Sequence, residues 1–150
     1  MRLNRRLLGC LCAVLLVLPT APLAWLLVRS GLFTGVAGFT GCLLALGGYR
    51  LGAGRFDALG FALAALLTPA AALPGMYYGC AELILQDNLR YGCTMEEALE
   101  AVPVVALDPI NRDLLLGALG GLLALDLLTA ILTAVWLRLK ARESAAPARR

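Results

Sequence analysis

One acidic side chain, Asp126, interrupts an otherwise uncharged apolar run at residues 114–137. Thr129 and Thr133 follow it at helical spacing, so the three polar groups share one face of a helix. An ionised Asp near the centre of a membrane span costs at least about 2.5–3.5 kcal/mol, so such a residue needs a reason to be there. These three residues are therefore the candidate polar site.

Two interpretations of Asp126 stay open. An acid within a membrane helix often marks a proton or cation pathway. Alternatively, a neutral Asp126 forms hydrogen bonds to neighbouring helices and serves packing alone. No Lys, Arg or His lies in any of the long apolar runs. The lack of a basic partner favours the structural interpretation.

Other kinds of chemistry are excluded by composition. The chain has no His, which removes Ser-His-Asp and Cys-His catalysis and imidazole metal ligation. Its five cysteines form no Cys-x-x-Cys pair, and four of them lie in apolar runs, where Cys usually acts as a small hydrophobe. We expect neither an enzyme nor a bound cofactor or metal.

The composition predicts an integral membrane protein. Of 150 residues, 61% are hydrophobic and 15% are charged, and the mean hydropathy is +0.83. Soluble domains carry about 25% charged residues. One core could not bury this much apolar surface, so a soluble globule, a disordered chain and a nucleic-acid-binding domain are excluded.

Four apolar runs are each about as long as a membrane span. They occupy residues 7–28, 31–49, 58–81 and 114–137. The predicted fold is all-α, a single domain over residues 1–150 with four transmembrane helices and a basic tail at residues 138–150. The first run resembles a signal peptide, but it exceeds the usual 7–15 residues and residues 19–24 make a poor cleavage site. We therefore expect it to be a retained span.

The basic residues predict the orientation. Of the 13 Arg and Lys residues, only Arg29, Arg90 and Arg112 fall on the side opposite the termini. Positive charge accumulates in cytoplasmic segments of membrane proteins. Both termini are therefore predicted to be cytoplasmic.

Small residues form a stripe in the second run. Successive members are three or four residues apart, which places them on one side of a helix; they are Gly31, Gly35, Gly38, Gly41, Ala45, Gly48 and Gly52. Small residues let two helix backbones approach closely in lipid. We interpret the stripe as a packing interface with another span or another subunit, although Gly is also simply common in membrane helices.

Prolines and caps mark further features. Pro69 and Pro74 predict a kink in the third run or, less favoured, a functional break of the kind that lines transporter sites. Thr94 and Glu97 form a capping-box pattern that begins a short amphipathic helix in the outer loop. We expect Pro103 to end that helix, and Pro109 to begin the fourth span.

Several of these features resemble an uncharacterised family of small four-span bacterial membrane proteins. The resemblance rests on Gly47-Gly48-Tyr49-Arg50, on Gly75 and Gly79, on Thr94-x-x-Glu97-Ala98, and on Leu116-Gly117. It covers about two thirds of the chain. It implies a location in the bacterial cytoplasmic membrane and brings no activity or functional residues.

Two function classes follow. The first is a structural or accessory membrane protein that packs with copies of itself or with a partner protein. The second is a small transporter or channel subunit with a proton or cation site at Asp126, Thr129 and Thr133. In either case we expect the chain to lie in the lipid bilayer and not to bind nucleic acid.

Overall fold

The computed structural model describes residues 2–145, and within them the side chains of residues 5–142. The described chain is all-helical, which confirms the predicted class. Its elements are α1 (Arg2–Val17), α2 (Thr20–Arg29), α3 (Gly35–Ala53), α4 (Ala58–Asn88), the 3-10 turn η1 (Leu89–Tyr91), α5 (Met95–Leu107) and α6 (Pro109–Ala145). Four stretches are long and apolar enough to cross a membrane, namely Arg5–Arg29, Gly35–Ala53, Ala58–Tyr91 and Pro109–Arg142.

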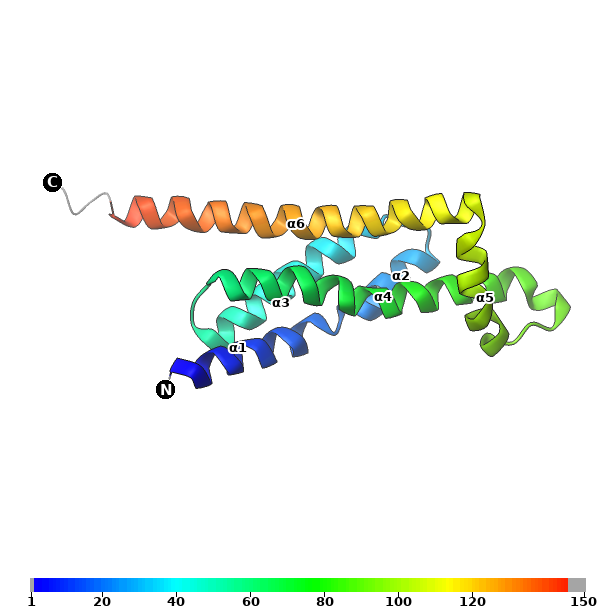
Figure 1. Cartoon of the computed structure of the whole chain (residues 1–150), viewed down its shortest axis with the longest axis horizontal. Helices are drawn as coiled ribbons and strands as arrows, with labels where there is room; N and C mark the ends of the chain where they lie inside the picture. The colour runs from blue at the N-terminus through cyan, green and yellow to red at the C-terminus, as the bar shows by residue number, and fades with distance from the viewer. Residues whose placement is uncertain (1, 146–150) are drawn as a thin grey trace.

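The long helices lie side by side, and one short helix crosses their end. Figure 1 shows α6 running the length of the bundle, with the start of α1 and the end of α6 at the same end of the molecule. Helix α5 lies at the opposite end, turned across the bundle, where it joins α4 to α6. An even number of antiparallel passes produces this arrangement.

The first apolar run consists of two helices, where the sequence predicts one span. Helix α1 ends at Val17 and α2 begins at Thr20. Pro19 and Pro22 each lack a backbone N–H, so two donors are missing around the junction. The two halves have different neighbours: α1 packs mainly along α3, and α2 packs mainly along α4.

The small-residue stripe contacts different helices along its length. At the α5 end of α3, a Cβ on Gly38 would overlap the carbonyl oxygen of Leu122 in α6. At the other end, a Cβ on Gly48 would lie 2.5 Å from the carbonyl oxygen of Cys12 in α1, and Gly52 is equally close to Leu8. Both contacts are made to backbone, so these positions accept no larger residue without a shift of a helix.

The first two members of the predicted stripe have different surroundings. Gly35 packs beside Phe33 and Leu125, as the stripe predicts for its outer end. Gly31, however, lies in the turn before α3 at φ 64°, with no atom within 4 Å of where its Cβ would be. Its role is the left-handed turn that only Gly adopts readily, so Gly31 does not belong to the packed stripe.

Helices α2 and α4 are joined by close backbone packing and by one polar group. A Cβ on Gly75 would overlap the carbonyl oxygen of Ala21. Near the α5 end, Trp25 Nε1 donates a 2.7 Å hydrogen bond to Glu82 Oε2. Arg29 Nη1 lies 3.2 Å from Glu82 Oε1. These contacts fix the two helices along their shared length.

Helix α4 is continuous through both of its internal prolines. It runs from Ala58 to Asn88 with Pro69 and Pro74 inside it. The structure therefore contains no interruption of α4 at either position.

Helix α5 begins as predicted but ends later. The capping box of Thr94 and Glu97 is present in both directions, which confirms that prediction. The expectation that Pro103 ends the helix is wrong, because α5 continues to Leu107 with Pro103 inside it. The carbonyl of Leu99, which Pro103 leaves without its helical donor, instead accepts a hydrogen bond from Tyr77 Oη at 2.7 Å. Helix α6 then begins at Pro109, as predicted.

Candidate functional site

Asp126 lies in the middle part of α6 and is completely buried, with 0% of its surface exposed. The close approach of α3 at Gly38 occurs beside it, since a Cβ there would lie 3.3 Å from the Asp126 backbone nitrogen. Neither carboxyl oxygen has a hydrogen-bond partner among the described residues. Asp126 is therefore a buried acid whose polar atoms the helices do not satisfy.

Three other helices bring polar side chains to the same region. Cys42 of α3 and Thr68 of α4 face the Asp126 carboxyl, although neither forms a hydrogen bond of ordinary geometry with it. Thr20 of α2 lies next to Thr68, because a Cβ on Gly41 would be within 3.0 Å of both threonine side chains. We call Asp126, Cys42, Thr68 and Thr20 the buried polar cluster.

The hydroxyl groups of this cluster are also unpaired. Thr20 Oγ1 and Thr68 Oγ1 are buried and have no hydrogen-bond partner in the described part of the chain. A buried polar atom without a partner costs about 1–3 kcal/mol. Four such oxygens in one region are the arrangement that a proton, a water molecule or a small cation would satisfy.

Thr129 and Thr133 are not joined to this cluster. Thr129 Oγ1 donates to the carbonyl of Leu125 at 2.5 Å, and Thr133 Oγ1 donates to the carbonyl of Thr129 at 2.7 Å. Both hydroxyl hydrogens are thus used within α6. Sequence reasoning placed the two threonines on the Asp126 face but missed that their donors are engaged by their own helix.

The other members of the buried polar cluster come from far away in the sequence. One signal for them exists, since Thr20 follows Pro19 and Thr68 precedes Pro69, each inside an apolar run. Cys42 carries no such signal. Within the described residues, no three His, Cys, Asp or Glu side chains gather to hold a metal ion.

A second polar group lies in the connection between α3 and α4. Asp57 Oδ1 accepts a hydrogen bond from the Gly60 backbone nitrogen at 3.2 Å and so caps α4. Arg6 and Arg55 each lie 3.6 Å from its other oxygen. Partial burial would raise the pKa of Asp57, but the Tyr49 hydroxyl, the Gly60 amide and the two arginines together lower it. The ionised carboxylate ties α1, α3 and α4 together.

No family model matches the chain, and neither a curated protein nor a solved structure matches it. The resemblance to four-span bacterial membrane proteins therefore stays a prediction from the sequence.

Proposed function

We propose that the chain is an integral membrane protein of the bacterial cytoplasmic membrane, with four spans and both termini in the cytoplasm. Four apolar helical stretches of spanning length support this proposal, as does the common end of α1 and α6 in Figure 1. Of the 11 basic residues within residues 2–145, eight lie toward that end, in agreement with the positive-inside rule.

Reporter fusions test this topology. A fusion after Arg150 should report the cytoplasm, and one within residues 86–108 should report the opposite side. An exported C-terminus would contradict the four-span arrangement.

Within that membrane, we propose a structural or accessory subunit, not an enzyme, that packs through α6 with a second copy or a partner protein. The supporting observation is an open small-residue face on α6. Gly117 and Gly120 have no atom within 4 Å of where a Cβ would lie, and Ala124, one turn further along that face, is exposed. Gly costs about 1 kcal/mol relative to Ala in a helix, so a second helix against this face would explain both glycines.

Glycines in the other helices differ from Gly117 and Gly120, because they are packed against neighbouring helices. In α3 and α4, Gly38, Gly52 and Gly75 each meet backbone of a neighbouring helix. Helix α6 contacts chiefly α3. Only 17% of the most apolar stretch of α6 is buried inside the molecule, compared with 56% of the corresponding stretch of α3. The face with Gly117 and Gly120 points away from the bundle.

Co-purification from native membranes tests the interface. We expect a tagged chain to retain a second, differently tagged copy or a defined partner, and Gly117→Leu with Gly120→Leu to lose it. Gly47→Leu is the matched control, since Gly47 also has open space around it but lies on α3. Equal retention by wild type and the Gly117/Gly120 variant would contradict the proposal.

A second candidate function is proton or cation transport through the buried polar cluster. It is favoured by the two unpaired oxygens of Asp126 beside two unpaired threonine hydroxyls. Asp126→Asn separates the two functions, because the amide keeps the size of the side chain but cannot ionise. If Asp126 carries protons or cations, wild type should show flux in liposomes, and Asp126→Asn should lose it while keeping the fold. If Asp126 serves packing alone, wild type should show no flux and Asp126→Asn should be as stable as wild type.

A further inference from the structure

A pocket of about 590 Å³ lies at the α5 end of the molecule, between α4, α5, α6 and the turn before α3. Its inner wall is apolar and includes Met76, Leu83, Val102 and Leu115. Volumes of this size are typical of sites for small molecules. The pocket shares no residue with the buried polar cluster.

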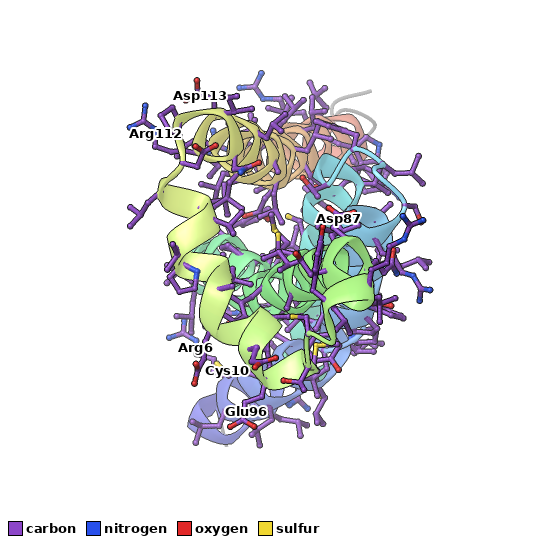
Figure 2. All side chains as sticks on the ribbon, turned by 90° about the vertical axis from the view of Figure 1, so that its right-hand side faces the viewer. Arg6, Cys10, Asp87, Glu96, Arg112 and Asp113 are labelled. Atoms are coloured by element: carbon purple, nitrogen blue, oxygen red, sulfur yellow. The ribbon has the colours of Figure 1, made fainter. Side chains whose placement is uncertain are left out.

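The rim of this pocket carries three polar side chains. They are Asp87 and Asn88 at the end of α4 and Asn111 in the first turn of α6. In Figure 2, which looks onto this end, Asp87 points from α4 toward α6, whereas Asp113 and Arg112 lie at the outer edge. Asp87 forms no ion pair with any side chain of residues 5–142.

The rim offers hydrogen-bond acceptors. Asn88 Nδ2 donates to the carbonyl of Ile84 at 2.9 Å, and Asn111 Nδ2 donates to Asp108 Oδ2 at 3.3 Å. Each amide thus uses one N–H donor within the protein, and its oxygen accepts no hydrogen bond from the side chains or backbone of residues 5–142. With the Asp87 carboxylate, the rim presents three acceptor groups and one negative charge.

Asp87 is the only charged side chain among the described residues that line the pocket. None of the described residues that line it is Lys or Arg. Helices α2, α4 and α5 end at the pocket, and α3 and α6 begin there. Helix C-termini carry partial negative charge and N-termini partial positive charge. Three C-termini against two N-termini leave a small negative excess, which adds to the negative charge of Asp87.

We propose that this pocket binds a small amphipathic amine. The ammonium group pairs with the Asp87 carboxylate and donates hydrogen bonds to the amide oxygens of Asn88 and Asn111. The single apolar chain or ring of the ligand packs against the apolar wall that includes Met76 and Leu115. An acceptor rim with a negative charge rejects carboxylates and phosphates, and a volume of about 590 Å³ is too small for a whole diacyl lipid. The proposal does not depend on the function of α6 or of Asp126.

Calorimetric titration of the full chain in phosphatidylcholine nanodiscs tests the proposal. The ligands are octylamine, octanol and octanoate, which share one apolar chain and differ only in the head group. Empty nanodiscs provide the correction for partition into lipid. We expect saturable binding of octylamine alone; equal binding of octanol, or no saturable binding of octylamine, would overturn the proposal.

Two pairs of variants place the ligand in the pocket. Asp87→Asn should weaken octylamine binding roughly twofold to fivefold, the range for an exposed charge pair. Asp113→Asn removes the same charge from the same end but outside the pocket, and should leave binding unchanged. Ala106→Phe should fill the pocket and reduce binding, whereas Val104→Phe, at a position 70% exposed and outside the lining, should not. Equal affinity in Asp87→Asn and Asp113→Asn would refute the assignment.

Discussion

The hydroxyl of Tyr77 in α4 donates a 2.7 Å hydrogen bond to the carbonyl of Leu99 in α5. That carbonyl lies four residues before Pro103, so it is the one acceptor that the missing proline N–H leaves open. A side chain from another helix thus replaces a backbone donor. This replacement lets α5 continue beyond Pro103 and anchors α5 to α4.

Tyr77→Phe should lower the free energy of unfolding by about 0.5–1.5 kcal/mol, because the Leu99 carbonyl loses its donor. Thermal unfolding in detergent measures the loss. In a Pro103→Ala background the helix supplies its own donor, so the same Tyr77→Phe change should then cost less. Tyr78→Phe is the control, since no interaction of the Tyr78 hydroxyl is present within residues 5–142. Equal costs of Tyr77→Phe in both backgrounds would disprove the coupling.

Gly38→Ala should destabilise the bundle by about 1–3 kcal/mol, since the new methyl group overlaps the Leu122 carbonyl and α3 and α6 must separate. Gly47→Ala adds the same methyl group into open space, where it should be neutral or should stabilise α3 by up to about 1 kcal/mol. Melting temperatures of the two variants provide the comparison. A Gly38→Ala protein as stable as Gly47→Ala would show that the α3–α6 contact is not tight.

The Asp57 carboxylate should make stability depend on acid pH. Its pKa is lowered in the folded state, so its contribution is present above its ordinary value of about 3.9 and declines as the pH falls through the lowered value. Asp57→Asn keeps a capping side chain but has no charge, so it should lose this contribution at neutral pH and with it this part of the pH dependence. Asp57→Ala also loses the cap of α4 and should cost about 1 kcal/mol. Unfolding curves measured from neutral pH down to about pH 2 cover this window and would distinguish the two variants; a wild-type pH dependence that persists in Asp57→Asn would contradict the prediction.

Glu97 should titrate below its ordinary range. Hydrogen bonds from the Thr94 backbone and hydroxyl lower its pKa, so the capping box holds above the ordinary Glu value of about 4.3 and is lost as the pH falls through the lowered one. Thr94→Val removes the hydroxyl, and the pKa of Glu97 should then rise toward its ordinary value. A carboxyl-detected NMR titration of the two proteins measures the shift; identical titration curves would contradict the prediction.

Local signals in the sequence predicted local structure well. The Thr94–Glu97 box and the start of α6 at Pro109 depend on residues within one turn, and both are present. Pro103 was misjudged because its effect depends on Tyr77, which a distant helix supplies.

In the candidate site too, local features were predictable from the sequence and contacts between distant helices were not. Hydropathy marked Asp126 as the exceptional polar residue, and it is fully buried. Its neighbours Cys42 and Thr68 were missed because they approach through the packing of α3 and α4 against α6, and no sequence period encodes which helix faces which. The open acceptors at Asp87 and Asn111 were missed for the same reason.

The junction at Leu18 and Pro19 has a consequence for how the chain tolerates length changes. In an unbroken helix, one inserted residue rotates everything beyond it by about 100°. Here α1 keeps its own phase against α3, and α2 keeps its own phase against α4. We therefore expect an extra residue at the junction to be accommodated by the turn, while the same insertion after Ala21 would rotate Trp25 away from Glu82. The first apolar run is thus two separately registered pieces that share one pass through the bundle.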